Sequence, residues 1–365
     1  MKITRIEPML IGIPYDHGGP KSADLTGAVR HTMDALYVKV ETDEGITGWG
    51  EAFGFGGCAL THAAYERLVT PIALGKDAID IEGTMADLHK RVVNLGRNGA
   101  AIFALSGIDV ALWDIRCKIA GRPLHKLLNA NSSASVPAYA SLLRLNEPQY
   151  VSKVSEQALK RGYKDIKLHE RTVACVKAAR DVLGPAPKLM VDTNCEWTPE
   201  RALEMAKAFE PFDLAWLEEP INPPDDYRSL AALRRAQPIP IAAGENLGNY
   251  FDVRNIIDAK AVDVVQPDAI KMGGITELWK AIAYAREAGV RVDPHSPLYG
   301  PGWIATVHVV AAMAQDALAE FYYADLEQSP LGDMIYPQNG FMRVPDGPGL
   351  GIEVDEKIIA KYRRM

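Results

Sequence analysis

The fold is decided by a pattern that recurs between residues 188 and 268. Its copies read KLMVDTN (188–194), LAWLEEP (214–220), PIAAGEN (240–246) and AVDVVQPD (261–268). Each copy is an apolar run that ends near an acidic residue, and segments with helical periodicity, such as 199–209 and 276–288, follow these runs. Short apolar runs that alternate with helical segments are typical of parallel strands connected by helices.

The same pattern extends along the chain in both directions. Four further runs read VPAYA (136–140), KDIKLH (164–169), VRVDPHS (290–296) and LAEFYY (318–323). Eight strands separated by helices predict an α/β barrel of the (β/α)8 type. An open, doubly wound sheet is the alternative, but it would be expected to carry a glycine-rich phosphate turn after its first strand, and none follows VPAYA.

The N-terminal part of the chain has a different order of predicted elements. Residues 1–13, 34–42 and 46–50 read as strands, whereas 61–129 is helical and contains AIFALSGIDVALWDIRCKIA at 101–120. Strands followed by helices predict an α+β domain. We place this domain at residues 1–130 and the barrel at 131–344. The tail, 345–365, contains turn residues and a predicted short strand, and we expect it to return to the first domain.

The composition excludes several functional classes. The 365-residue chain is 48% hydrophobic and 24% charged, with a net charge of −7, which is the ordinary mixture of a soluble globular protein. It shows neither a basic footprint for nucleic acid nor an apolar run of about 18 residues. The four cysteines have no CxxC spacing and fit a reduced compartment. We therefore predict a cytoplasmic enzyme or small-molecule binder, with no nucleic-acid or membrane partner.

Ionisable residues recur at the ends of the predicted barrel strands. They lie about one strand–helix unit apart and are Asp192, Glu218, Glu245, Asp268, His295 and Glu320. In such barrels the carboxyl ends of the strands meet at one mouth, so these side chains should converge there. Acids at strand–helix junctions are also common helix N-caps. Neighbouring residues are the better cap candidates in places: Thr193, Asn194 and Thr198 near the third strand, and Asn246 near the fifth.

Three of these carboxylates, Asp192, Glu218 and Glu245, predict a metal site. Crowded carboxylates repel one another and raise one another's pKa, and a divalent cation removes that conflict. Because all the ligands are oxygens, the site favours Mg²⁺ or Mn²⁺ over Zn²⁺ or Cu²⁺.

Two further pairs are expected beside this site. Lys167 and His169 are two residues apart on the second strand, so they share one face. A nearby Mg²⁺ and Lys167 are expected to lower the pKa of His169 and keep it neutral. Asp268 and His295 end neighbouring strands, and a carboxylate beside an imidazole fixes its tautomer and raises its basicity. The alternatives are a surface lysine with an incidental histidine, and a structural core histidine.

The order and spacing of these residues resemble the enolase superfamily, and within it the mandelate racemase-like subgroup. The resemblance covers essentially the whole chain. It is carried by ALSGIDVALWDI (104–115), LEEP (217–220), GEN (244–246), VVQPDAIKMGG (264–274) and PDGPGLGIEVD (345–355). The resemblance implies a modified (β/α)7β barrel, an N-terminal α+β capping domain completed by the C-terminal tail, and a homo-oligomer.

The resemblance also implies roles for individual residues. The three carboxylates named above would bind Mg²⁺, with Mn²⁺ as a substitute. Asp268 and His295 would form an acid–base dyad, and Glu320 would hydrogen-bond a substrate carboxylate oxygen. Lys167 matches the first lysine of the family's KxK motif, and Asn194 matches a polar residue two positions after the metal aspartate. The second lysine of KxK is replaced here by a histidine, which puts lysine-based proton abstraction on that face in doubt.

Members of this family read the substrate with two loops of the capping domain, here approximately residues 15–25 and 53–57. From the first loop we predict substrate contacts by Tyr15, His17 and Lys21; Asp16 and Asp24 lie in the same loop. Its polar content suits a hydroxylated substrate, although a solvated loop without function is the alternative. PHSPLYGPG (294–302) also resembles the corresponding loop of acid-sugar dehydratases.

The family removes a proton α to a carboxylate and stabilises the resulting enediolate, with Mg²⁺ as the main Lewis acid. We therefore predict a Mg²⁺-dependent acid-sugar dehydratase that forms a 2-keto-3-deoxy acid. The alternative is a racemase, epimerase or cycloisomerase of a related carboxylate, with Lys167 or His169 acting opposite His295. A non-catalytic metal-binding protein is a third hypothesis. The Asp268–His295 pair argues against it, because a binder needs no general base.

Overall fold

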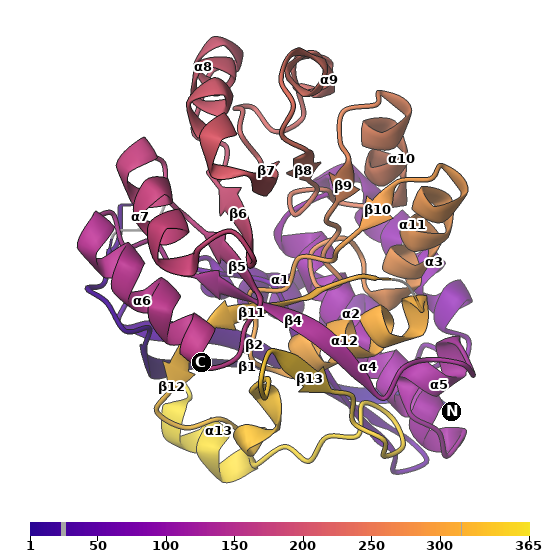
Figure 1. Ribbon diagram of the computed structural model, residues 1–365. Helices are drawn as coiled ribbons and strands as arrows, with labels where there is room; N and C mark the ends of the chain where they lie inside the picture. The colour runs from indigo at the N-terminus through magenta and orange to yellow at the C-terminus, as the bar shows by residue number, and fades with distance from the viewer. Residues whose placement is uncertain (23–26, 315) are drawn as a thin grey trace.

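The computed structural model describes residues 1–22, 27–314 and 316–365 of the chain. These residues form a four-stranded sheet, a nine-stranded sheet and the helices around them (Figure 1). No helix in the described ranges is long and apolar enough to span a bilayer.

The four-stranded sheet is built mainly from the N-terminal segment. β1 (Ile3–Asp16), β2 (Thr32–Thr42) and β3 (Thr47–Ala52) pair antiparallel in sequence order. The fourth strand, β12 (Asp325–Leu326), comes from the distant end of the chain and pairs with β1. The sequence predicted the first three strands, but it did not predict β12, which is too short to carry a periodic signal.

The helices that follow β3 cover this sheet. Their bounds are α1 (Cys58–Ala64), a π-helical turn (Tyr65–Val69), α2 (Thr70–Ala73), α3 (Ile81–Val92), α4 (Ala100–Ile119) and α5 (Leu124–Leu128). α4 is buried on nearly all sides, as its almost continuous apolar sequence predicts. Gly48 and Gly50 of β3 let α4 come close, because a Cβ at either position would overlap a helix carbonyl oxygen, that of Ala111 or Gly107.

One face of α4 holds the N-terminal layer against the barrel. Ser106 Oγ accepts a hydrogen bond from the Gly273 amide at 2.8 Å, and Asp109 Oδ1 accepts one from the Thr276 amide at 3.1 Å. Trp113 Nε1 donates to Thr276 Oγ1 at 2.9 Å. The three α4 residues share a helix face because they are three and four positions apart. The motif ALSGIDVALWDI therefore places polar groups of α4 at the start of the barrel helix α11 (Ile275–Glu287).

The second sheet contains the eight predicted barrel strands. They are β4 (Ser135–Leu142), β5 (Asp165–Leu168), β6 (Lys188–Asp192), β7 (Leu214–Glu218), β8 (Ile241–Ala243), β9 (Val264–Val265), β10 (Arg291–Val292) and β11 (Ala319–Tyr323). The strands run parallel in the order β10-β9-β8-β7-β6-β5-β4-β11. The last strand, β11, pairs with the first, β4, as in a barrel and unlike the open doubly wound alternative.

Seven helices connect these strands and lie outside them in Figure 1. They are α6 (Pro148–Lys160), α7 (Val173–Leu183), α8 (Pro199–Phe209), α9 (Tyr227–Ala236), α10 (Tyr250–Asp258), α11 and α12 (Pro301–Met313). The fold is therefore the predicted (β/α)7β barrel. β10 and β11 share no ladder among the described residues. Instead Asp293, just after β10, accepts a hydrogen bond from the Leu318 amide at 2.7 Å and joins the two sides of this seam.

The C-terminal tail contacts the N-terminal layer. α13 (Glu356–Tyr362) packs on β1, and the Arg364 amide donates to the Leu10 carbonyl oxygen at 2.8 Å. The short strand predicted within 345–355 does not form; this stretch makes one isolated bridge, between Gly349 and Pro123. Its prolines and glycines disfavour a regular strand. β13 (Phe341–Arg343) pairs with the beginning of β4. Boundaries near residues 130 and 345 remain our proposal for the two domains.

Candidate active site

Three strand-end carboxylates meet at one mouth of the barrel. Asp192 ends β6, Glu218 ends β7, and Glu245 follows β8. One oxygen from each carboxylate lies within 4.8 Å of the others. Asp192 and Glu218 are fully buried, whereas Glu245 reaches the pocket above. Three crowded oxygen donors of this kind suit a hard divalent cation such as Mg²⁺.

These carboxylates do not cap the following helices. The N-caps are Thr198 for α8, Asp226 for α9 and Asn249 for α10, and each side chain accepts an amide hydrogen bond from its own helix. Of the three candidates near the third strand, Thr198 is the cap, and Thr193 and Asn194 are not. Asn246 as a cap was wrong, because α10 begins farther along the chain and the Asn246 amide instead donates to Glu219 at 2.9 Å.

Lys167 lies among the carboxylates, below the pocket. Its Nζ atom is 2.8 Å from Glu218 Oε1, 2.8 Å from Glu320 Oε1 and 3.8 Å from Asp192 Oδ2. Burial alone would lower the pKa of Lys167, but Glu218 and Glu320 outweigh it and raise the pKa well above its usual value. Lys167 is therefore a buried ammonium counter-ion in this arrangement.

Glu320 also lies below the pocket. Its Oε2 atom accepts a hydrogen bond from the Ser296 amide at 3.0 Å, while Oε1 contacts Lys167. Burial would raise the pKa of Glu320, but Lys167 and His295 lower it to about 2. Both carboxylate oxygens thus already have donors within the protein. A hydrogen bond from Glu320 to substrate remains a prediction.

The imidazole of His169 is held at both ring nitrogens. Nδ1 lies 2.6 Å from the Leu142 carbonyl oxygen, which can only accept, so Nδ1 carries the proton. Nε2 lies 3.2 Å from Asp192 Oδ2. Burial and Lys167 lower the pKa of His169, as expected from the sequence, but the hydrogen bond and charge of Asp192 outweigh them and raise it. Asp192 is the contribution that the sequence reasoning left out, and the lowering expected from a nearby Mg²⁺ stays a prediction.

Asp268 and His295 form the predicted pair. His295 Nδ1 is 2.7 Å from Asp268 Oδ2, and the Ile270 amide donates to the other Asp268 oxygen at 2.8 Å. His295 Nε2 faces Glu245 Oε2 at 2.9 Å. Burial lowers the pKa of His295, but Glu245, Glu320 and Asp268 raise it well above its usual value.

The expected effect of crowding on the carboxylates is only partly present. Burial raises the pKa of Glu218 to about 7, and Asp192 and Glu320 add to this rise. Burial would raise the pKa of Glu245 as well, but His295 and Lys271 lower it well below its usual range. The sequence did not predict this difference, because it depends on which cations the tertiary structure places beside each carboxylate.

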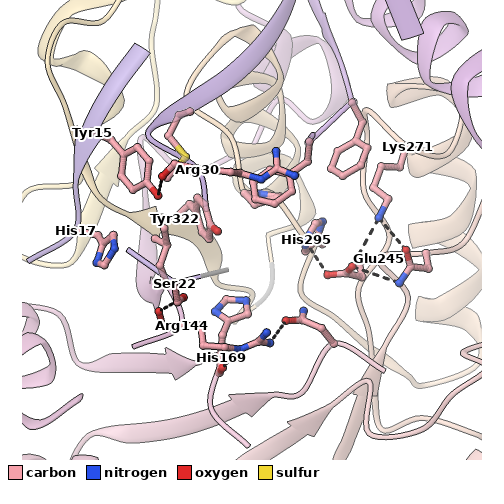
Figure 2. A pocket seen from close by; sticks show the side chains of 17 residues that line it. Tyr15, His17, Ser22, Arg30, Arg144, His169, Glu245, Lys271, His295 and Tyr322 are labelled. Atoms are coloured by element: carbon pink, nitrogen blue, oxygen red, sulfur yellow. Dashed lines mark hydrogen bonds and ion pairs between the residues drawn. The ribbon is translucent and has the colours of Figure 1, made fainter. Parts of the chain in front are cut away.

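A cavity of about 310 Å³ lies above these groups. Figure 2 shows that its lining comes from the N-terminal layer on one side and from the barrel on the other. The N-terminal side chains are Tyr15, His17, Ser22, Arg30, Met33, Phe53 and Phe55. The barrel side chains are Leu143, Arg144, His169, Asn194, Glu245, Asn246, Lys271, His295, Pro297 and Tyr322.

Some of the predicted substrate-contacting residues line this cavity, and one does not. Tyr15, His17 and Asn194 line it, and their contact with substrate remains a prediction. Lys21 does not line it; its Nζ atom donates to the His31 carbonyl oxygen at 3.1 Å and lies 4.2 Å from the centre of the Tyr15 ring. Asp24 lies outside the described residues.

The sequence reasoning missed Arg144, which follows β4. Its Nε donates to the His169 carbonyl oxygen and its Nη2 to Asn194 Oδ1, both at 2.8 Å (Figure 2). Asn194 in turn donates to Asp192 Oδ2 at 2.9 Å. Arg144 thus connects the pocket to the carboxylate cluster. Applying the strand-end rule to basic as well as acidic residues would have found it.

Glu219 and Lys271 were also missed. Glu219, the second glutamate of LEEP, is buried and accepts hydrogen bonds from Asn246 and from Cys195 Sγ at 3.1 Å. Burial raises the pKa of Glu219 to about 8, and Glu245 and Asp192 add to the rise. Lys271 Nζ lies 3.1 Å from Asn246 Oδ1 and 3.7 Å from Glu245 Oε1. Both residues belong to motifs that carried the resemblance, so their motif membership was the available signal.

Comparison with known proteins agrees with this geometry. Residues 21–129 match the mandelate racemase/muconate lactonizing enzyme N-terminal domain, and residues 149–358 match the enolase C-terminal domain-like family. An arabinonate dehydratase from Saccharolobus solfataricus is 32% identical over 354 residues, covering 93% of each chain. A D-galactarolactone cycloisomerase from Agrobacterium fabrum is 33% identical over 382 residues, covering 100% of this chain and 99% of the relative.

A solved structure gives the same result for the fold. A racemase from Streptomyces coelicolor, crystallised with bound magnesium, superposes with a TM-score of 0.87 at 28% identity, covering 99% of this chain and 100% of its own. The family matches span most of both structural layers, and the relatives align over nearly their whole length. The chain is therefore an enzyme that belongs to the mandelate racemase/muconate lactonizing enzyme family of the enolase superfamily.

Proposed function

We propose that the enzyme is a Mg²⁺-dependent acid-sugar dehydratase that forms a 2-keto-3-deoxy acid. The observation that carries this proposal is the buried 2.7 Å contact between His295 Nδ1 and Asp268 Oδ2. A carboxylate on the nitrogen remote from the pocket makes an imidazole a stronger base at its other nitrogen. His169 has a backbone carbonyl in that position instead. This difference favours one general base, His295, at the mouth of the barrel.

One base is enough for dehydration. His295 accepts the proton α to the substrate carboxylate at Nε2, and Asp268 stabilises the imidazolium that forms. A divalent cation held by Asp192, Glu218 and Glu245 supplies Lewis-acid stabilisation of the negative charge that develops on the substrate carboxylate. Lys167 adds a fixed positive charge beside that carboxylate cluster.

The second half of the reaction uses the same histidine. Protonated His295 donates its proton to the β-hydroxyl group, the Cβ–O bond breaks, and water leaves. The electron pair of the enediolate forms the Cα–Cβ double bond. The resulting enol takes up a proton from solvent at Cβ and becomes the 2-keto-3-deoxy acid. An epimerase would need a second base, but Lys167 is held between two buried carboxylates and the remote nitrogen of His169 contacts a carbonyl oxygen.

The lining of the cavity supports a hydroxylated substrate. Tyr15, Ser22, Arg144 and Asn194 place polar groups around a cavity of about 310 Å³. His17 is buried in the same lining, and its Nδ1 atom has no hydrogen-bond partner among the described residues. Burial lowers the pKa of His17, which favours the neutral imidazole. A neutral imidazole can exchange a hydrogen bond with a substrate hydroxyl group in either direction.

A cycloisomerase is the second candidate, favoured by the full-length similarity to the D-galactarolactone cycloisomerase. The first step would be the same proton abstraction. If the β-oxygen belongs to a ring, the Cβ–O bond still breaks, but the oxygen stays attached and the ring opens. Dehydration lowers the product mass by one water, whereas cycloisomerisation leaves the mass unchanged.

A substrate screen tests both candidates. Mg²⁺-loaded enzyme is incubated with a library of aldonic acids, aldaric acids and their lactones, and 2-keto acid formation and product mass are measured. We expect a product lighter by one water, formed by the parent and by the control variant His89→Asn but not by His295→Asn. A product of unchanged mass would favour the cycloisomerase, and turnover by His295→Asn near the parent rate would refute His295 as the base.

A further inference from the structure

Glu218 is held by three donors inside the barrel. Lys167 Nζ donates to Oε1 at 2.8 Å, whereas Trp216 Nε1 and Gln266 Nε2 each donate to Oε2 at 2.9 Å. All four side chains are at most 2% exposed. Trp216 lies two residues before Glu218 on β7, and Gln266 follows β9, so the donors come from different strands.

Gln266 reaches Glu218 across an intervening strand. β8 lies between β7 and β9 in the barrel order. The chain of β8 contributes only Ala242 to the interior there, followed by Gly244. Gly244 has a φ of 141°, and a Cβ at this position would lie 2.7 Å from the backbone nitrogen of Gln266. Gly244 therefore lets the backbone at Gln266 come close to the chain after β8, and from there the Gln266 side chain reaches Glu218.

The side-chain amide of Gln266 also contains a buried polar atom, its oxygen, without a hydrogen-bond partner in the described part of the chain. Its Oε1 atom is buried and has no hydrogen-bond partner among the described residues. An unsatisfied buried acceptor costs about 1–3 kcal/mol. Turning the amide over would place Oε1 against Glu218 Oε2, and two acceptors repel each other. The observed orientation therefore keeps one acceptor unsatisfied while giving the N–H group to Glu218, as expected where function outweighs stability.

We propose that Gln266 and Trp216 are positioning residues that orient the Glu218 carboxylate for the divalent cation. This inference rests on the proposed metal site. A carboxylate with each oxygen fixed by a donor cannot rotate freely, and each oxygen keeps a lone pair for another partner. Loss of a donor that orients a metal ligand in this way typically weakens metal affinity by about 10–100-fold.

Divalent-cation affinity provides the test. Gln266→Met keeps a side chain of similar length but removes the donor, and Trp216→Phe keeps an aromatic ring but removes the indole N–H. Metal-stripped parent and variants are titrated with Mg²⁺ by isothermal titration calorimetry, and melting temperatures are recorded. We expect the Kd of Gln266→Met to rise about 10–100-fold, with a change in the same direction for Trp216→Phe.

Matched controls separate positioning from general packing. Gln237→Met removes a buried amide that donates to the Ile239 carbonyl oxygen at 2.7 Å, and Trp303→Phe removes an indole that donates to the Ile335 carbonyl oxygen at 2.9 Å. Neither side chain contacts the carboxylate cluster, so both controls should bind Mg²⁺ like the parent.

Three outcomes would overturn the inference. If the parent binds Mg²⁺ and both test variants bind it equally well, the two residues do not position Glu218. If the controls lose as much affinity as the test variants, the loss reflects packing alone. A parent that binds no divalent cation would refute the proposed metal site itself, and the positioning roles with it. Because Trp216→Phe is independent of Gln266→Met, failure of one variant to fold leaves the other as a test.

Discussion

His169 is the residue at which this chain departs most clearly from the KxK pattern. Its Nδ1 atom is bound to the Leu142 carbonyl oxygen and its Nε2 atom contacts Asp192. The neighbouring Lys167 lies between Glu218 and Glu320. Lys167 is thus held by two buried carboxylates, and His169 has a carbonyl oxygen at the nitrogen where His295 has Asp268. We infer that neither Lys167 nor His169 removes the α-proton.

Hydrogen exchange tests this inference at the level of single residues. His295→Asn is incubated with substrate in D₂O, and the α-proton signal is followed by NMR. We expect no exchange, because the variant lacks the imidazole of His295, which Asp268 makes more basic. Deuterium incorporation that disappears when His169→Ala or Lys167→Met is added would refute the single-base mechanism and favour an epimerase.

At the scale of elements, a buried carboxylate joins strand β3 to helix α12. Glu51 Oε2 accepts a hydrogen bond from the Gly302 amide at 2.9 Å, in the first turn of α12, where the helix dipole favours negative charge. Its Oε1 atom has no partner among the described residues. Burial raises the pKa of Glu51 to about 8, and nearby Asp268 adds to the rise. The contact therefore connects the N-terminal layer to the first turn of α12, the helix that follows the loop carrying His295.

This contact predicts a pH-dependent stability. The pKa of Glu51 is higher in the folded than in the unfolded state. The stability that protonated Glu51 contributes to the fold is therefore fully present below the unfolded pKa of about 4.5. The contribution is lost as the pH rises through about 8. The side chain of Glu51→Gln cannot ionise. The free energy of unfolding of this variant, relative to the parent, should therefore rise by on the order of a few kcal/mol between pH 5 and pH 8.

Thermal unfolding measured across this pH range provides the check. The melting temperature of Glu51→Gln minus that of the parent should increase with pH by several degrees. Glu200→Gln, at an exposed carboxylate on α8, is the matched control and should follow the parent at every pH. Parallel curves for Glu51→Gln and the parent would show that Glu51 does not carry this dependence.

At the scale of the whole molecule, the carboxylate cluster exists only when the barrel is closed. Asp192, Glu218 and Glu245 come from three consecutive strands that are far apart in the unfolded chain. A cation bound by all three should therefore stabilise the folded state, by about 2.7 kcal/mol when its free concentration is 100 times the Kd. The predicted homo-oligomer remains a prediction, which light scattering would test.

Metal removal tests this coupling between site and fold. Treatment with EDTA should abolish activity and lower the melting temperature, and added Mg²⁺ should restore both. Asp192→Asn should fold but show no Mg²⁺-dependent rise, because it lacks one ligand. Asp181→Asn, on the exposed surface of α7, should respond like the parent. Full activity after exhaustive chelation would contradict the proposed metal dependence.

The sequence alone determined the barrel and the convergence of its strand-end groups. Both follow from local periodicity, because a residue at the end of each parallel strand must reach the same mouth whatever the details of packing. Asp192, Glu218 and Glu245 meet as predicted, and Asp268 contacts His295. The short strand β12 and the bonds made by α4 were beyond this reasoning, since they depend on contacts between distant segments.

Only the tertiary structure decided which charges face one another within the site. Lys167 and Glu320 pair below the pocket, Lys21 turns to the His31 carbonyl oxygen, and Arg144 enters the lining. Periodicity specifies the face on which a side chain lies, but not its partner across the barrel. That partner depends on strand register and on the length of the side chain, as Gln266 shows by donating to Glu218 from beyond the intervening strand β8.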